Sequence, residues 1–382
     1  MLERKKKFIN WVEINSKALK NNVGLIKKIA GEKVGIIAVV KSNAYGHGLV
    51  EVAKILSAEG TAMFGVNALS EALKLRHAGI KENILVMGYI LPDEFKDAIE
   101  NKIDITLFDE KMIPEIDRAA LKSKRVARVH LKFDSGMGRL GIPLKNVLSA
   151  INKIKKYPSI KLWGLSSHFA CADTTQDTNH LQIKNILGVL SEIQKLKIKI
   201  PILHFSNSAM SVRSAMKEFL NQNVGQLFIR PGILLYGMSP FGQKIKMLND
   251  FKPVLSWKTK VIQLKKFPAG HCISYGCTYR TQKNEIIATV STGYYEGFDR
   301  KFSNNGEVLI HGKRAKVRGR VCMDFMMVDV SKIKGVKVGD EVVIIGKSGK
   351  EEISAKNLAD QIHTINYEIT TRINLEIPRI VV

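Results

Sequence analysis

The sequence predicts an α/β protein with an N-terminal (β/α)8 TIM barrel, residues 1–240, followed by a C-terminal mainly β domain, residues 241–382. Two observations favour this fold class. Short apolar, β-branched runs alternate with longer segments of helical spacing in the first part, and the pattern changes to alternating strands after about residue 240. Eight apolar runs match the strands of such a barrel. An open, doubly wound sheet is the alternative.

The first part reads as strands and helices in alternation. A run that is apolar on both faces suits a parallel strand covered by helices. We expect strands of this kind at 34–40, 62–66, 83–88, 103–107, 126–132, 160–166, 201–205 and 226–230. We expect helices at 17–30, 48–58, 69–78, 109–122, 143–156 and 176–197. One helix therefore precedes the first strand of the barrel.

The second part has a different pattern. Residues 254–265 alternate between apolar and polar side chains, and glycine-containing turns at 311–313 and 339–340 separate shorter runs. Those runs occupy 285–291, 306–310, 313–319, 325–330 and 340–346. Alternation with short turns is typical of antiparallel strands.

The net charge of +25, from 60 basic and 35 acidic residues, raises nucleic acid or an anionic membrane as partners. The excess is spread along the chain, however, and lysine outnumbers arginine. Specific phosphate and base contacts favour the arginine fork, so we expect no nucleic-acid partner. No apolar run approaches the roughly 18–20 residues of a membrane span, so we expect no membrane association.

Location and redox state follow from the N-terminus and the cysteines. The basic cluster at 4–7 has no apolar segment after it, so we expect no signal peptide. The four cysteines are too sparse for a disulfide scaffold and lack the spacing of metal ligands. We therefore expect a cytoplasmic, reducing location and no metal.

Catalytic groups in a barrel lie where the strands end, and Lys41 directly follows the run 34–40. Desolvation at a strand end lowers the pKa of a lysine, which covalent chemistry with an aldehyde cofactor requires. A lysine that extends its amine to water is the alternative. Tyr45 adds a hydroxyl that can bind phosphate, and Gly46 and Gly48 allow a tight turn.

Polar residues follow other predicted strands too. Arg230 ends a run and places a cation beside the backbone N–H groups of Gly232 and Ile233, which suits an anion such as phosphate. An ion pair between Arg230 and a carboxylate is the alternative. Asn207 and Ser208 precede a helical segment, where they serve as caps or phosphate donors. Further candidates at strand ends are Lys132, Asp134, His168 and Ser206.

Nine motifs, in order along essentially the whole chain, resemble those of the bacterial alanine racemases, which are barrel enzymes dependent on pyridoxal 5'-phosphate. The motifs are AVVKSNAYGHG (38–48), KFDSGMGRLGI (132–142), SSHFACAD (166–173), HFSNSA (204–209), RPGILLYG (230–237), ISYGCTY (273–279), TGYYEGFDR (292–300), GRVCMD (319–324) and INYEI (365–369).

The resemblance implies that Lys41 holds pyridoxal 5'-phosphate covalently and acts as one of two bases that interconvert L- and D-alanine. Tyr275 would be the other base, supplied by the second subunit of a homodimer. His168 would link Tyr275 to Arg230 through hydrogen bonds, and Arg230 would face the pyridine nitrogen. The residues expected to bind the cofactor are Lys41, Tyr45, His168, Asn207, Ser208, Arg230, Gly232, Ile233 and Tyr367.

The same resemblance implies substrate contacts and a role in the cell. Arg139 and the backbone N–H of the partner's Met323 would hold the alanine carboxylate. Lys132 matches a lysine that is carbamylated in this family and then orients the arginine, although an unmodified lysine in an ion pair is equally open. Supporting and entryway residues would be Lys132, Asp173, Tyr294, Arg300 and Arg320. The product D-alanine would supply bacterial peptidoglycan.

Two other hypotheses remain open from the sequence. One keeps the cofactor and changes the substrate or the reaction, to a racemase of serine, lysine or ornithine or to a decarboxylase of similar fold. The other is a protein that binds the cofactor or nucleic acid without turnover, as the net charge of +25 suggests.

Overall fold

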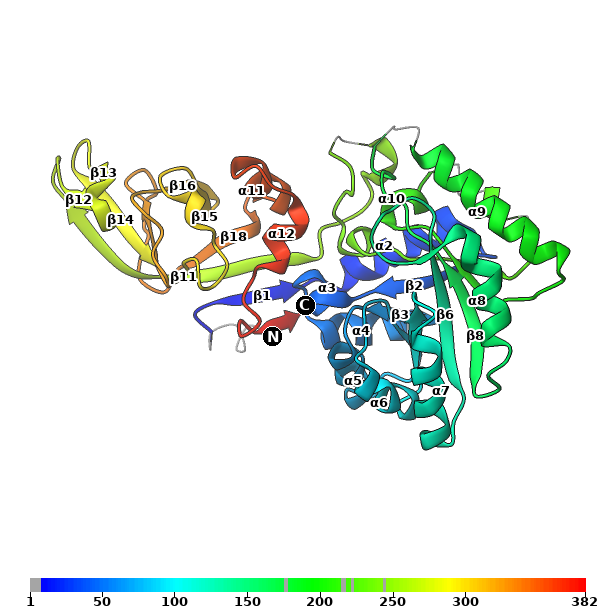
Figure 1. The fold of residues 1–382 in the computed structure, drawn as a ribbon. Helices are drawn as coiled ribbons and strands as arrows, with labels where there is room; N and C mark the ends of the chain where they lie inside the picture. The colour runs from blue at the N-terminus through cyan, green and yellow to red at the C-terminus, as the bar shows by residue number, and fades with distance from the viewer. Residues whose placement is uncertain (1–7, 175–177, 214–217, 221–222, 243–244) are drawn as a thin grey trace. The chain divides into compact units, whose positions relative to one another are not determined.

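The structure is a computed structural model, and it describes residues 8–174, 178–213, 218–220, 223–242 and 245–382 (Figure 1). The basic cluster at 4–7 lies outside the described residues. The chain divides into two compact units. The barrel unit consists of 18–44 and 52–252, and the β unit consists of 1–17, 45–51 and 253–382.

A ring of parallel strands forms the centre of the barrel unit. Within the described residues these strands are β2 (Gly35–Val39), β3 (Met63–Val66), β4 (Asn83–Val86), β5 (Ile103–Leu107), β6 (Ala127–Asp134), β8 (Ile160–Ser166), β9 (Ile202–His204) and β10 (Gln226–Ile229). The pairing of β10 with β2 and of β5 with β6 closes the ring. All eight predicted strands are confirmed, and the open-sheet alternative is wrong.

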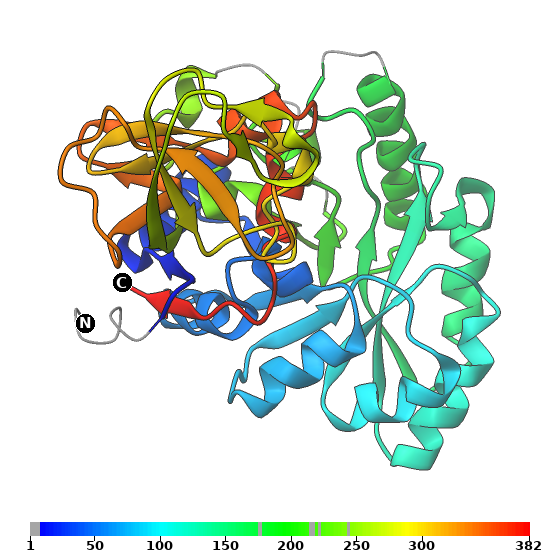
Figure 2. The same cartoon turned by 90° about the vertical axis from the view of Figure 1, so that its left-hand side faces the viewer.

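Helices surround the ring, as Figures 1 and 2 show. They are α2 (Ser16–Ala30), α4 (Leu49–Ala58), α5 (Leu69–His77), α6 (Phe95–Glu100), α7 (Met112–Ser123), α8 (Val147–Ile154) and α9 (Thr178–Lys195). In α7 the buried residues Met112, Ile113, Ile116, Ala119 and Ala120 recur at intervals of three and four, which places them on one helical face. The predicted helices are confirmed, and α6 is an addition.

A large, mainly antiparallel sheet forms most of the β unit. Its order is β19 (Glu351–Ile353), β18 (Glu341–Ser348), β15 (Glu307–Ile310), β16 (Lys313–Val317), β17 (Met326–Asp329), β14 (Glu285–Val290), β11 (Leu255–Phe267), β1 (Trp11–Ile14) and β20 (Arg379–Val381). β12 (Cys272–Ile273) and β13 (Tyr279–Arg280) form a small hairpin, and α11 (Ala355–Gln361) and α12 (Asn366–Thr371) follow β19. The predicted antiparallel β domain is confirmed.

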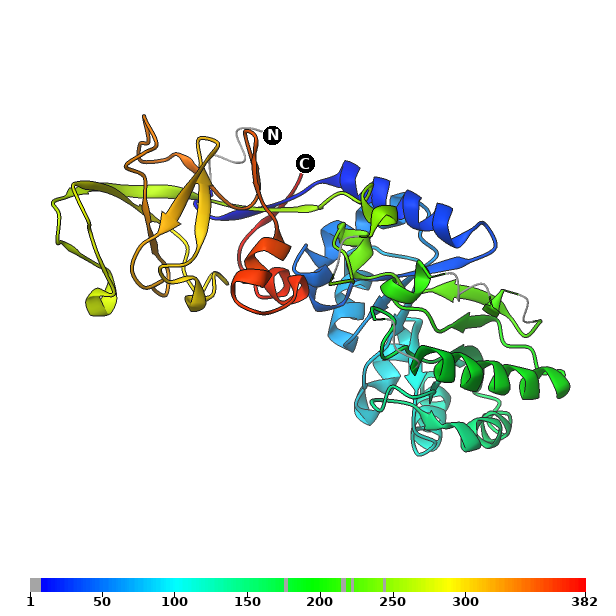
Figure 3. The ribbon, with the colours of Figure 1, turned by 90° about the horizontal axis from the view of Figure 1, so that it is seen from above.

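Two features of the β unit were not predicted. The N-terminal strand β1 pairs with the long strand β11, beside which it runs in Figure 3, and with the C-terminal strand β20. Cys272 and Cys277 form a disulfide, which the sparse cysteines had not suggested. In the described part of the chain, no helix is long and apolar enough to cross a membrane.

Candidate active site

Cationic side chains gather at the carboxyl ends of the barrel strands. Lys41 follows β2, Lys132 lies near the end of β6, and Arg230 follows β10. The charges of Arg230, Arg139 and Lys41 all act on the Lys132 amine and, together with the larger effect of burial, lower its pKa to about 8. The structure therefore brings together the lysines and arginines that the sequence predicted for the barrel part of the site.

Lys41 begins a turn with an unusual backbone. Ser42, Asn43, Ala44 and Tyr45 all have φ between 53° and 56°, so the short α3 (Lys41–Tyr45) is wound to the left. Such a conformation costs roughly 1–2 kcal/mol for each residue that is not glycine, so other contacts must hold it. The carboxylate of Glu71 accepts the N–H of Ser42 at 2.5 Å and that of Asn43 at 3.4 Å.

The environment of Lys41 favours its neutral amine. Burial is the main cause that lowers the pKa of Lys41, and the positive charge of Arg139 adds to it, while Glu71 opposes both. A neutral amine is the nucleophilic and basic form of lysine. The prediction that desolvation depresses the pKa of this lysine agrees with these causes.

The loop after β6 carries Arg139 and is built around Asp134. One carboxylate accepts three backbone N–H groups, from Gly136 at 2.8 Å, Met137 at 2.7 Å and Gly138 at 2.9 Å. A side chain on Gly141, whose φ is 143°, would collide with the backbone of β6. These contacts fix the backbone of the loop from which the exposed Arg139 side chain extends.

Arg230 is buried and is held by neutral acceptors. Its guanidinium donates to the carbonyl oxygens of Ser167 at 2.6 Å and Phe205 at 3.1 Å, and to His204 O. It also contacts Nδ1 of His204 at 2.8 Å and Nδ1 of His168 at 3.1 Å. No carboxylate within the described residues pairs with it, so the ion-pair alternative finds no support there. Burial and Arg139 lower the pKa of Arg230 to about 9, which leaves the guanidinium charged at neutral pH.

His168 is neutral in this surrounding. Burial is the largest cause that lowers the pKa of His168 well below its usual value, followed by the charges of Arg230 and Arg139. Because a guanidinium can only donate, Nδ1 of His168 accepts from Arg230 and the ring proton lies on Nε2.

The segments after β9 and β10 meet at Ser208. Asn207 caps α10 (Ser208–Ser211) by accepting the N–H of Met210 at 3.0 Å, as the cap prediction required. The backbone N–H of Gly232 donates to Ser208 Oγ at 2.8 Å, and Ile233 begins a short 3-10 turn. The buried hydroxyl of Ser206 has no hydrogen-bond partner in the part of the chain that the structure describes.

The β unit holds other predicted residues on neighbouring loops. Ser274, beside Tyr275, donates its hydroxyl to Arg320 O at 2.6 Å, and the N–H of Tyr294 donates to Cys322 O at 3.1 Å. The rings of Tyr45 and Tyr367 lie 6.0 Å apart. The predicted site residues that are exposed are Tyr275, Tyr294, Met323 and Arg300, together with Asp173 in the barrel unit.

Three buried polar residues near Arg230 were missed as site residues. His204 contacts Arg230 directly, His130 contacts His204, and Asp104 contacts His130. Each is a buried polar residue within one of the predicted strands, IDITL, VARVHLK and PILHF. Buried polar groups need partners, so three such strands in one barrel were a usable signal.

A closed barrel with cationic groups gathered at the carboxyl ends of its strands defines an enzyme of the (β/α)8 class whose site suits an anionic ligand. A family model described as alanine racemase, N-terminal domain, matches residues 14–240, and one described as alanine racemase, C-terminal domain, matches residues 254–381. The chain belongs to the alanine racemase family. It is an isomerase that racemises alanine.

Relatives of known name agree with the family models over nearly the whole chain. Alanine racemase of Halothermothrix orenii is 41% identical across 97% of this chain and 96% of its own length. A solved alanine racemase of Clostridium difficile 630 has a TM-score of 0.91 and 35% identity, with 98% of this chain and 96% of that chain covered. The alanine racemase of Bacillus anthracis with bound L-Ala-P has a TM-score of 0.87 and 37% identity, with 98% and 95% covered.

Proposed function

We propose that this enzyme racemises alanine with pyridoxal 5'-phosphate, by exchanging the Cα proton between Lys41 and Tyr275 of a second copy of the chain. The observation that carries this proposal is the contrast between the two bases. Lys41 is partly buried within the barrel unit, whereas the Tyr275 side chain is 71% exposed on the β unit. At neutral pH a phenol acts as a base only when nearby donors or cations stabilise its phenolate, and a second copy of the chain would bring such groups to Tyr275.

The residues at the strand ends fit this cofactor. The Lys41 amine is available for covalent attachment, and Arg230 is a fixed cation suited to face the pyridine nitrogen. Ser208 and Ile233 would offer a hydroxyl and a backbone donor to a phosphate, and the Gly232 N–H, which here donates to Ser208 Oγ, would turn to it as well. The hydroxyl of Ser206 is buried and unpartnered in the described chain. Burial raises the pKa of Tyr45 to about 12, so its hydroxyl keeps the proton that it would donate to the phosphate, with Tyr367 beside it.

The reaction then divides among side chains with separate tasks. When bound, pyridoxal 5'-phosphate withdraws electrons from the substrate and so acidifies the Cα proton. Lys41 Nζ would take or return that proton on one face, and Tyr275 Oη of the partner subunit on the other. Arg139 and the partner's Met323 N–H would hold the carboxylate, so that the substrate does not turn between the two transfers.

Arg230 and His168 support this exchange. Arg230 donates hydrogen bonds and keeps its protons, so the pyridine nitrogen beside it would stay unprotonated. That limits the electron withdrawal and suppresses side reactions of the substrate. The Nε2–H of His168 is a donor that would stabilise the phenolate of the partner's Tyr275.

An exposed apolar patch supports the second copy. The patch consists of the exposed residues Tyr275, Tyr294, Tyr295, Met323 and Phe325, of which Tyr275 is 71% and Met323 54% exposed. Backbone hydrogen bonds from Tyr294 to Cys322 and from Tyr295 to Met323 join two of its loops. Exposed patches of large apolar side chains mark interaction sites. We propose that a homodimer covers this patch.

Mixing two inactive variants tests the shared site. Lys41→Ala and Tyr275→Ala should each lack one base and be inactive alone. In a mixed dimer with twofold symmetry, one site carries both changes and the other carries neither. Random mixing should restore roughly a quarter of the unsubstituted rate. Mixed dimers that form, as mass spectrometry can show, but stay inactive would contradict the sharing of sites.

The role in the cell is proposed from the product. D-alanine made in the cytoplasm would supply peptidoglycan synthesis. Expression of the chain in a bacterium that requires added D-alanine should remove that requirement, and the Lys41→Ala variant should not.

A further inference from the structure

A chain of buried polar side chains runs from Arg230 into the interior of the barrel. Arg230 Nη1 lies 2.8 Å from Nδ1 of His204, and Nε2 of His204 lies 2.8 Å from Nδ1 of His130. Nε2 of His130 lies 3.3 Å from Oδ2 of Asp104. Exposure is 7% for Arg230, 2% for His204, and zero for His130 and Asp104. These hydrogen bonds thus link side chains of strands β9, β6 and β5 to the site.

Gly164 leaves the space in which the two imidazoles meet. It lies on β8, which separates β6 from β9 in the sheet. A Cβ atom at this position would collide with the His130 ring, at Nδ1. Nδ1 is the atom that contacts His204, so a side chain at 164 would abolish the contact.

Arg230 at one end of this series of hydrogen bonds and Asp104 at the other determine where the imidazole protons lie. A guanidinium only donates, so His204 Nδ1 accepts and its proton is on Nε2. Burial is the main cause that lowers the pKa of His204 well below its usual value, so the ring is neutral. His204 Nε2–H then donates to His130 Nδ1, and His130 Nε2–H donates to the Asp104 carboxylate. Both imidazole donors point away from Arg230.

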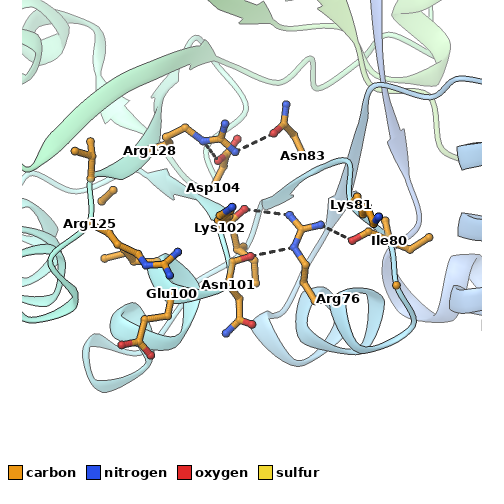
Figure 4. A pocket seen from close by; sticks show the side chains of 15 residues that line it. Arg76, Ile80, Lys81, Asn83, Glu100, Asn101, Lys102, Asp104, Arg125 and Arg128 are labelled. Atoms are coloured by element: carbon orange, nitrogen blue, oxygen red, sulfur yellow. Dashed lines mark hydrogen bonds and ion pairs between the residues drawn. The ribbon is translucent and has the colours of Figure 1, made fainter.

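Arg128 fixes the orientation of Asp104, at the other end of these hydrogen bonds. Its Nε donates to Oδ1 of Asp104 at 2.6 Å, and its Nη2 donates to Asn83 at 3.0 Å (Figure 4). These residues line a cavity of about 820 Å³ at the amino ends of β4, β5 and β6. Because Arg128 occupies Oδ1, the oxygen that remains for His130 is Oδ2.

We propose that Asp104 is a positioning residue for racemisation, which fixes the tautomers of His130 and His204 so that a lone pair faces Arg230. This arrangement holds a buried cation in place without a carboxylate next to it. The guanidinium therefore keeps its full charge and its direction toward the ligand. The step from Arg230 to the pyridine nitrogen rests on the function proposed above, whereas the tautomers do not.

Nuclear magnetic resonance of the holoenzyme tests the tautomers directly. The chain has nine histidines, and labelling their ring nitrogens with ¹⁵N distinguishes protonated from unprotonated positions. Substitution of His130 and His204, one at a time, assigns the signals. We expect both rings to be neutral with the proton on Nε2. A proton on Nδ1 of His204, or a doubly protonated ring in the unsubstituted protein, overturns the proposal without any variant at Asp104.

Asp104→Asn tests the consequence for Arg230. The amide oxygen should stay with Arg128, so the amide nitrogen faces His130 and reverses both tautomers. His204 then presents an N–H to the N–H of Arg230. We expect kcat to fall about tenfold, with KM changed less than about twofold, because a buried donor is left without an acceptor. The absorption spectrum of the bound cofactor should also shift.

Asp117→Asn is the matched control. Asp117 accepts the hydroxyl of Ser159 and is not part of the buried chain. It should leave the histidine tautomers, kcat and the spectrum unchanged. If Asp104→Asn folds and behaves like Asp117→Asn, Asp104 has no positioning role. Protein that has the expected tautomers but binds no pyridoxal 5'-phosphate would count against the proposed function and leave the tautomer assignment intact.

Discussion

The two proposed bases lie in regions that differ in how they are held. Lys41 sits on a left-handed turn that the carboxylate of Glu71 ties down, and its pKa responds to burial and to Arg139. Tyr275 lies on a loop whose backbone is anchored through Ser274 to Arg320, but its own side chain is 71% exposed. Lys41 is thus partly buried within the barrel unit, whereas Tyr275 is exposed on the surface of the β unit.

The barrel unit places charged groups around Lys41 within a single polypeptide, whereas the β unit leaves Tyr275 exposed. Burial and the charge of Arg139 lower the pKa of both Lys132 and Arg230, because charges act strongly on desolvated groups. The phenol of Tyr275 is exposed to water until another surface covers it. The two regions therefore predict different losses when each is changed.

Removing Lys41 should have the largest effect. Lys41→Ala deletes the amine that attaches the cofactor and serves as one base, so we expect kcat/KM to fall by at least about a thousandfold. The visible absorbance of the attached cofactor should disappear as well. Lys54→Ala, on the exposed face of α4, is the control and should keep both. Retained absorbance in Lys41→Ala would show that another lysine binds the cofactor.

Tyr275→Phe should come next, with a loss of roughly a hundredfold to ten-thousandfold in racemisation, as expected for removal of an acid–base group. Cofactor absorbance should remain, because Lys41 is untouched. In deuterated water, exchange of the Cα proton of one alanine enantiomer should continue without racemisation. Tyr157→Phe, between α8 and β8, should be silent. Loss of exchange from both enantiomers would contradict the division of faces between the two bases.

The barrel was predictable because its strands are buried on both faces. Most therefore read as apolar, β-branched runs, and all eight runs became strands, including β6 and β8, which carry some charged residues. β1 and β20 were not predicted, because both are short and are stabilised by pairing across almost the whole chain, as in Val12 with Arg379. Local sequence carries no signal for such a pairing. The boundary at residue 240 remains a prediction.

The site was predictable only where polar residues follow strands. Lys41, His168 and Arg230 were found in this way, and the structure brings His168 and Arg230 into contact. The left-handed turn was not predictable, because Ser42 to Tyr45 contain no glycine and Glu71 lies far away in sequence. The roles of the residues remain proposals that the variants test.

Changes at Lys132 should have a smaller effect that depends on pH and CO2. The pKa of Lys132 is about 8, so the neutral amine grows as pH rises through that value. A neutral amine forms a bond to CO2 and releases a proton, and the resulting carbamate would be an anionic neighbour for Arg139. We expect added bicarbonate to raise activity more at about pH 8.5 than at about pH 7. Lys132→Ala should raise KM for alanine about tenfold and abolish the response.

Mass spectrometry under native conditions checks the modification itself. The unsubstituted chain should carry the additional mass of one CO2, which acid treatment removes. An unmodified mass together with an activity that ignores bicarbonate would favour the alternative in which Lys132 is an ordinary charged lysine.

The smallest effect on activity should come from the disulfide beside Tyr275. Replacing Cys272 and Cys277 together by serine opens a ring of about six residues, which should cost about 2 kcal/mol of stability in the β unit. Thermal unfolding would measure this loss, and Cys171→Ser, a free cysteine of the barrel unit, is the control.

The rate should change less than about twofold, because the loop has other anchors that oppose local opening. The hairpin pairs Ile273 with Tyr279, the Ser274 hydroxyl binds Arg320 O, and Gly319, with φ of 76°, packs against the backbone at Ile273. These contacts fix the backbone around Tyr275 without the sulfur atoms. If kcat falls strongly while the fold survives, the bridge itself positions Tyr275. Tyr275 would then be held as firmly as Lys41, and the two regions would differ only in that Tyr275 needs a second copy of the chain to bury it.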